Sequence, residues 1–162
     1  VASMDWGGTI MNRYMSQDNK SRHPRQTTDV FEMAAGIMNQ AAIQCVAMCP
    51  NNLTDIPQFE IDWLKQLPTT WDETRFIDGY PGKYVVLARR HGQTWYIAAT
   101  NATKEPMKLT LDLSSMLQKG DIATLYSDNA KTREPEKSEL KIRKANKVTL
   151  TIQPDGGAVI VK

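Results

Sequence analysis

The stretch that decides the fold has the sequence YVVLARRHGQTWYIAATN and covers residues 84–101. Two runs rich in β-branched and aromatic residues, 84–90 and 94–100, flank a turn at His91-Gly92. Residues of these types favour strands, and a short turn containing glycine between two such runs is typical of a β-hairpin. The stretch therefore predicts two paired antiparallel strands.

Toward the C-terminus, apolar and polar residues alternate with a period of two. Leu109, Leu111 and Leu113 show this alternation, and it recurs in residues 140–143 and 148–152. Strands with one buried and one solvated face have this pattern. With two further strands at 122–126 and 158–161, the seven short strands predict an antiparallel sandwich or barrel.

Toward the N-terminus, the period changes near residue 68 and becomes helical. Apolar residues spaced three and four apart predict a helix over 29–40, with Asp29 as its N-cap and Glu32 completing a capping box. A second helix is predicted over 57–67, because Pro57 suits a first helical turn and Pro68 ends the segment.

Residues 41–48 form an apolar run that fits either a continuing helix or a buried strand, and periodicity does not choose between them. The run holds both cysteines of the chain, Cys45 and Cys49. Two cysteines are too few for a disulfide-built fold, and neither histidine is close enough in sequence to complete a metal site. We expect both to be buried free thiols.

Composition narrows the class of protein. Hydrophobic residues make up 41% of the 162 residues and charged residues 23%, as in globular proteins. The net charge of +2 is too small to indicate a nucleic-acid partner, and no apolar run is long enough to predict a membrane span.

Few residues suggest chemistry. No phosphate loop, metal-ligand spacing or nucleophile elbow is present. Asp72 and Glu73 are adjacent, so on an extended chain they point to opposite faces and do not converge on one substrate. We interpret them as partners of Arg75 or as turn caps. Asp5-Trp6 combines a carboxylate with an indole, as in many sugar sites, although a loop carboxylate without a role is the more frequent case.

Two segments, WDETR at 71–75 and PGKYVVLARR at 81–90, resemble the start of the C-terminal domain of glycoside hydrolase family 97. This is a family of calcium-dependent α-glucosidases and α-galactosidases of Bacteroidetes and their relatives. Asp5-Trp6, with Met4 before it, resembles a late barrel strand of that family. Residues 43–47 resemble its last barrel strand, with Cys45 in place of a histidine.

The resemblance implies an α+β chain in two parts. Residues 1–68 would be the last strand and helix elements of a (β/α)8 catalytic barrel, and residues 69–162 an antiparallel β-sandwich. On this reading residues 42–48 are a strand and residues 57–67 are the final barrel helix. We expect the sandwich to fold alone, whereas the helical part would expose apolar residues, namely Ile37, Ile43, Val46, Trp63 and Leu64.

The family's catalytic and calcium-binding glutamates lie upstream, in a Glu-Gly-x-Arg-Gly-x-Glu segment that has no match here. We therefore predict no catalytic or metal-binding residue, no calcium bound by this chain, and no activity of the chain alone. Asp5 and Trp6 are candidate substrate contacts, and Trp71, with Asp72, Glu73 and Arg75, is a candidate structural anchor.

The resemblance also implies partners and a location. The whole enzyme would use calcium, act on an α-linked oligosaccharide and lie in the periplasm or cell envelope. This chain would pack against the N-terminal part of that enzyme and take part in homo-oligomers. The alternative is a free-standing β-sandwich that binds carbohydrate or protein.

Overall fold

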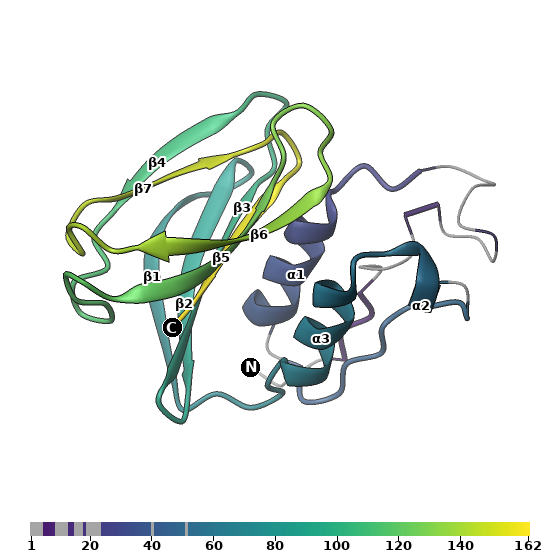
Figure 1. Ribbon diagram of the computed structural model, residues 1–162, viewed down its shortest axis with the longest axis horizontal. Coiled ribbons are helices and arrows are strands. Elements are labelled where there is room, and N and C mark those ends of the chain that lie inside the picture. Colours follow the sequence, from purple (N-terminus) through teal and green to yellow (C-terminus); the bar gives the residue numbers. More distant parts are fainter. Residues whose placement is uncertain (1–4, 9–12, 15–17, 19–23, 40, 51) are drawn as a thin grey trace.

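The computed structural model describes residues 5–8, 13–14, 18, 24–39, 41–50 and 52–162 (Figure 1). The described residues form helices α1 (Asp29–Met38), α2 (Asn52–Asp55) and α3 (Gln58–Gln66). Their strands are β1 (Glu73–Tyr80), β2 (Tyr84–His91), β3 (Thr94–Asn101), β4 (Met107–Leu111), β5 (Ile122–Asp128), β6 (Pro135–Lys141), β7 (Val148–Ile152) and β8 (Gly157–Val161).

The strands build two antiparallel sheets, which confirms the predicted β-rich fold. One sheet has the order β1-β2-β3-β8-β5-β6, and the other pairs β4 with β7. The predicted hairpin is β2–β3, in which His91 lies opposite Thr94. A core of alternating side chains fills the space between the sheets, with Val86, Ile97 and Ile160 among its most buried members. Burial of this inner face is what the period of two predicted.

Two strands differ from the sequence prediction. Strand β1 was not predicted, because ETRFIDGY mixes charged and apolar residues and a bulge between Phe76 and Asp78 interrupts its alternation. Strand β6 was predicted at 140–143 but spans Pro135–Lys141, and most of its side chains are exposed. Both are edge strands, which have a neighbouring strand on one side only. Fewer of their side chains need to be apolar, so the alternating pattern is weaker.

Helix α1 lies where the 3.6-residue period predicts, but its cap is one residue earlier. The N-cap is Thr28, whose hydroxyl accepts a hydrogen bond from the Phe31 N–H at 3.1 Å. Asp29 instead pairs with Arg25. Glu32 accepts a hydrogen bond from the Thr27 hydroxyl at 2.6 Å rather than closing a capping box on Asp29. The prediction of Asp29 as the cap was wrong because hydroxyl and carboxylate oxygens compete for the same N–H groups.

Helix α1 covers the outer face of the large sheet, on the side opposite β4 and β7 (Figure 1). Its residues Val30 and Ile37 share a second hydrophobic core with Ala98 of β3 and Val159 of β8. Trp63 of α3 is buried in the same core. The expectation that Ile37 and Trp63 are exposed is therefore wrong, because the sheet supplies the surface that covers them.

The segment after α1 is extended. Gln44 forms an isolated parallel bridge with Trp6, and Ala47 N–H donates to the Gly8 carbonyl at 2.7 Å. Helix α1 lies between these two segments in the sequence, but neither segment forms a strand. The strand predicted over 42–48 is therefore wrong in extent, because only the backbone around Gln44 finds a partner among the described residues. Ile43 is 60% exposed, as expected, and Val46 and Leu64 are half-buried. Both cysteines are free, but Cys45 is exposed and Cys49 half-buried, so the prediction of buried thiols was wrong.

Helix α3 ends at Gln66, one residue before the predicted end, with Leu67 as its C-cap directly before Pro68. Pro57 is its N-cap, directly before the first helical residue, and its fixed φ of −58° suits that position. None of the helices in the described part of the chain has the length and apolar character of a membrane span.

Candidate functional site

Asp5 and Trp6 lie at the parallel bridge rather than at an open sugar platform. The Trp6 N–H donates to the Ile43 carbonyl at 3.2 Å, and its indole is half-buried in the second core. The ring lies directly over Gly36 of α1, where an added Cβ would be 3.1 Å from it. Asp5 beside it is exposed. The indole face is thus occupied by packing against α1.

Trp71 lies where the chain passes from α3 to the sheet. Its ring meets the Tyr96 ring edge to face, with centroids 5.3 Å apart, and the Arg89 guanidinium lies 5.7 Å from its centre. Arg89 is only 6% exposed and donates to the carbonyls of Met38 at 3.1 Å and Asn39 at 3.3 Å. A cation at these carbonyls also complements the helix dipole. Trp71 and Arg89 therefore join the sheet to the C-terminus of α1.

The neighbouring charged residues pair with one another. Arg75 donates to Glu73 at 2.6 Å, and Arg90 lies 3.4 Å from the other Glu73 oxygen. These hydrogen bonds, with Arg75 the larger contributor, lower the pKa of Glu73. Asp72 accepts from the Gly92 N–H at 2.7 Å and fixes the β2–β3 turn. Both guanidinium groups also lie over the Trp95 ring, at 5.0 and 5.9 Å.

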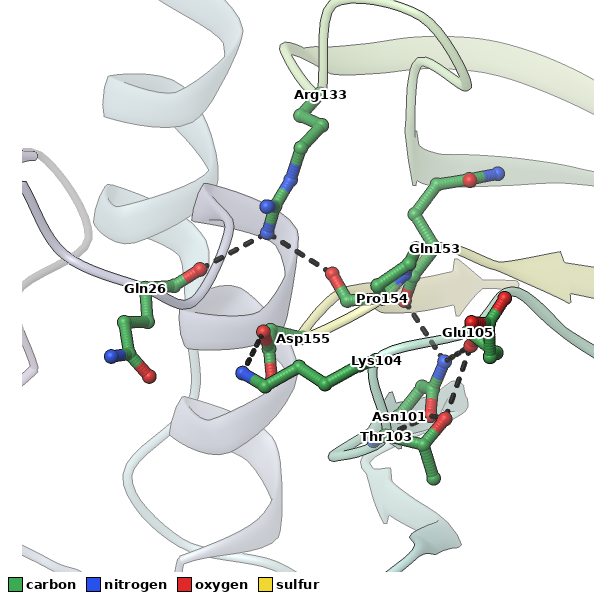
Figure 2. A network of polar contacts seen from close by, with 9 residues as sticks. All are labelled: Gln26, Asn101, Thr103, Lys104, Glu105, Arg133, Gln153, Pro154 and Asp155. Atoms are coloured by element: carbon green, nitrogen blue, oxygen red, sulfur yellow. Dashed lines mark hydrogen bonds and ion pairs between the residues drawn. The ribbon is translucent and has the colours of Figure 1, made fainter.

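A polar network joins three loops at one end of the sandwich (Figure 2). Asn101 is fully buried at the end of β3. Its amide donates to the carbonyls of Glu105 at 2.8 Å and Gln153 at 3.1 Å. Its oxygen accepts from the Thr103 N–H at 2.9 Å and from the Thr103 hydroxyl at 2.7 Å. One side chain therefore holds the β3–β4 loop against the β7–β8 loop.

The same network reaches the segment before α1. Arg133, in a left-handed conformation with φ of 62°, donates to the Gln26 carbonyl and the Pro154 carbonyl, both at 3.0 Å (Figure 2). The Thr28 N–H donates to the Asp155 carbonyl at 3.0 Å. Lys104 pairs with the Asp155 carboxylate at 2.6 Å. The β3–β4, β5–β6 and β7–β8 loops thus converge on the N-terminus of α1.

A cavity of about 400 Å³ adjoins this network. Charged side chains contribute much of its lining, and the residues are Arg13, Tyr14, Pro24, Arg25, Gln26, Thr27, Thr28, Asp29, Arg133, Glu134 and Asp155. The charges are paired across it: Arg13 lies 2.6 Å from Glu134, and Arg25 pairs with Asp29. The Arg13, Arg25, Asp29 and Glu134 charges that line the cavity are therefore compensated in pairs.

Buried carboxyl groups lie behind the cavity. Glu60 of α3 is fully buried, and neither of its carboxyl oxygens has a hydrogen-bond partner among the described residues. Burial, with the nearby Asp29 carboxylate, raises the pKa of Glu60 to about 9. Burial also raises the pKa of Asp128 to about 6, although the Gly157 N–H, at 2.8 Å, partly offsets this. Glu60 is therefore protonated at neutral pH.

These groups do not form a hydrolytic site. Glycoside hydrolysis needs two carboxyl groups that face each other across the substrate bond, and Glu60 has no access to a substrate. His, Cys, Asp and Glu side chains of the described residues form no group of three or more that could hold a metal ion. What the arrangement does is join the helical segment to the sandwich.

The Glu73–Arg75 pair agrees with the sequence prediction, and the role of Trp71 as an anchor stays a prediction. Asn101, Arg133 and Glu60 were not predicted. Asn101 follows a predicted strand and looks like an ordinary turn residue. Arg133 and its acceptor Gln26 are 107 residues apart in the chain. Glu60 lies in a polar helical segment that gives no signal of burial.

The described residues define a β-sandwich with a helical segment docked on the outer face of its larger sheet. Residues 70–161 match the family model described as the glycosyl-hydrolase 97 C-terminal domain, oligomerisation. The chain belongs to this family.

Longer relatives extend the match beyond the sandwich. A retaining α-galactosidase of Bacteroides thetaiotaomicron is 26% identical over 136 residues, which cover 82% of this chain and 20% of that protein. A probable retaining α-galactosidase of Streptomyces bingchenggensis is 29% identical over 140 residues, 86% of this chain and 21% of that protein. The chain thus spans about a fifth of these relatives.

Solved structures agree with the fold. The crystal structure of a β-arabinopyranosidase matches with a TM-score of 0.91 and 50% identity, over 99% of this chain and 25% of that one. A glycoside hydrolase family 97 enzyme from Pseudoalteromonas sp. strain K8 matches with a TM-score of 0.72 and 21% identity, over 85% of this chain and 23% of that one. At that identity the second match shows the fold alone.

Proposed function

We propose that this chain is the C-terminal part of a family 97 glycosidase, where it packs against the catalytic domain and promotes oligomerisation. The observation that carries the proposal is the parallel bridge between Trp6 and Gln44, with α1 between these two residues in the sequence. Parallel strands joined through a helix are the repeating unit of a (β/α)8 barrel. Such a unit has open edges that further barrel strands would pair.

The contact between the sandwich and the helical segment supports the same proposal. The outer face of the sheet, Trp71 and the Arg133 network all engage α1, which would be a barrel helix. A sandwich that binds a barrel helix through a buried core holds a fixed position relative to the barrel. In the whole enzyme, Asp5 and Trp6 would belong to a late barrel strand. We propose that Asp5 is the residue of this chain nearest to the substrate and that Trp6 orients this strand.

For the whole enzyme, we propose hydrolysis of an α-galactoside or of a β-arabinopyranoside. The support is the 50% identity to the β-arabinopyranosidase and the two α-galactosidase relatives. The two sugar types are related: β-L-arabinopyranose has the ring configuration of α-D-galactopyranose without its hydroxymethyl group. We also include α-glucosides among the proposed substrates, because residues 81–90 resemble a family that contains α-glucosidases.

Calcium and a periplasmic or cell-envelope location belong to the same proposal and rest on the resemblance alone. The described residues do not fit a calcium site, because they contain no cluster of three carboxylate or histidine ligands. The enzyme's calcium would be held by residues outside them.

Two experiments test the proposal. The reading frame that encodes this chain is expected to continue upstream into a catalytic domain, and its full product should hydrolyse nitrophenyl α-galactopyranoside or β-arabinopyranoside. The 162-residue chain alone should hydrolyse neither of these nor the α-glucoside, with or without calcium. Turnover by the chain alone that survives repurification would refute the assignment, as would a full product inactive on all three sugars.

The proposed role in oligomerisation has its own test. Sedimentation of the chain over a range of concentrations should show a dimer or larger species. A monomer at every concentration would remove oligomerisation from the proposed function but leave the packing role intact.

A further inference from the structure

The two edge strands of the large sheet, β1 and β6, differ in the side chains that they expose. Edge strand β6 presents alternating charges, Glu136, Lys137, Glu139 and Lys141, which discourage contact with another chain. Edge strand β1 also carries charges, and it has a bulge between Phe76 and Asp78, but its Phe76 side chain is 67% exposed. A single exposed apolar side chain is ordinary on a protein surface, so what Phe76 indicates depends on the residues around it.

Phe76 is part of a larger apolar surface. It lies directly opposite Leu87 on β2, and Gly79 lies opposite Val85. Residues opposite each other share one face of a sheet, so these side chains are on the same face. Its ring lies over Gly79, whose added Cβ would be 3.2 Å from it. We name this surface the β1–β2 face and define it by Thr74, Phe76, Gly79, Val85 and Leu87.

The β1–β2 face is the continuation of the outer sheet face that α1 covers elsewhere. Thr74 lies opposite Arg89, which reaches the end of α1 at Met38 and Asn39. Helix α1 packs on β3, β8 and β5. Phe76, Val85 and Leu87 belong to neither of the two hydrophobic cores. The helical layer therefore stops short of this end of the sheet, at the left of Figure 1.

The occupant that fits this face is a second copy of the chain. The matching family is described by its role in oligomerisation, and its model begins at residue 70, so it includes β1 and β2 but none of the helices. In a contact with two-fold symmetry the same surface of both copies meets, so an apolar face would be buried against an apolar face.

The contact is expected between faces rather than between strand edges. The bulge between Phe76 and Asp78 disturbs the backbone spacing that an added strand would need. Asp78 is also engaged, since it accepts hydrogen bonds from the Gly79 N–H at 2.8 Å and the Tyr84 hydroxyl at 3.1 Å.

We infer that the β1–β2 face, centred on Phe76, is the surface through which two copies of this chain associate. The inference rests on the proposed role in oligomerisation and names the surface and partner for it. Phe76 is the anchor, because aromatic side chains at the centre of an interface contribute most of its binding energy.

The test is sedimentation equilibrium of the 162-residue chain and of variants. Phe76→Lys is expected to raise the dimer dissociation constant at least about tenfold, because it places two like charges at the two-fold axis. Val85→Thr, which keeps the β-branched shape, should weaken the dimer less. The matched control is Ile43→Lys, since Ile43 is similarly exposed but lies in the extended segment after α1. Circular dichroism melting confirms that each variant is folded.

The possible outcomes distinguish failure of this inference from failure of the proposed role in oligomerisation. A wild-type dimer that Phe76→Lys dissociates and Ile43→Lys does not would support the β1–β2 face. A dimer that Phe76→Lys leaves intact overturns this inference but not the role in oligomerisation, and dissociation by Ile43→Lys would place the contact on the helical side. A wild-type chain that is monomeric throughout overturns both.

Discussion

At the scale of single residues, burial controls the chemistry of Glu60. Its carboxyl group is excluded from solvent and carries a pKa of about 9. In the unfolded chain the same group ionises near pH 4.5, so between these values the folded state binds the extra proton. The stabilising effect of that proton is fully present below about pH 4.5 and is lost as the pH rises toward 9.

We therefore expect Glu60→Gln to raise the free energy of unfolding at pH 8 by about 1–3 kcal/mol. The amide cannot ionise, so stability should no longer fall between pH 6.5 and 9, a range above the pKa of Asp128. Urea unfolding at several pH values measures this. Glu139→Gln, at an exposed position on β6, is the control and should change nothing. A wild-type stability independent of pH above 6.5 would contradict the prediction.

Trp71 is the second residue whose role can be measured. Its ring is half-buried between Tyr96 and Arg89. Trp71→Ala should lower the free energy of unfolding by about 2–4 kcal/mol, since it removes a large ring from the second core. Trp71→Phe should recover most of that loss, because the indole N–H has no hydrogen-bond partner among the described residues. Equal stability of the wild type and the alanine variant would show that the ring fills no essential space.

At the scale of elements, the docking of α1 on the sheet depends on one glycine. A Cβ added to Gly157 of β8 would collide with the Val30 carbonyl oxygen and approach the Phe31 nitrogen to 2.7 Å. These are backbone atoms of α1, so they cannot move without shifting the whole helix. The close approach explains why a strand of otherwise large side chains begins with glycine.

Gly157→Ala is expected to lower the free energy of unfolding by about 1–3 kcal/mol, as overpacking usually does. Gly7→Ala is the matched control, since its added Cβ would be 3.6 Å from the Cys45 carbonyl oxygen, an ordinary contact. Thermal unfolding of both variants gives the comparison. Similar melting temperatures for the two would mean that α1 is free to shift on the sheet.

At the scale of the whole molecule, the two hydrophobic cores differ in which parts of the chain build them. The core between the sheets is built entirely from residues after 69, whereas the outer core combines those residues with α1 and α3. Residues 69–162 should therefore fold alone, but with Ala98, Tyr126 and Val159 uncovered.

We expect the fragment 69–162 to show a cooperative thermal transition and strand-type circular dichroism. It should also bind a hydrophobic dye several-fold more strongly than the 162-residue chain, because the outer sheet face has lost its helix. Absence of a cooperative transition would show that the outer core is needed for folding. Dye binding no greater than that of the whole chain would show that the face is not apolar enough to matter.

The part of this molecule that the sequence by itself determined is local. The period of two from residue 84 onward, the turn at His91-Gly92 and the three-and-four spacing around Val30 each predict an element from nearest neighbours. Such patterns arise because a strand or helix must place its apolar residues on one face. The resemblance to the family likewise lies in two short contiguous segments, residues 71–75 and 81–90.

Tertiary structure decided everything that depends on a surface from elsewhere in the chain. Ile37 and Trp63 are buried only because the second core combines α1 and α3 with residues of the sheet, and Glu60 is neutral only because α3 is covered. Arg133 finds Gln26 across 107 residues of sequence. The physical reason is that burial and pKa depend on which groups approach in space, and a sequence pattern describes only one side of each contact.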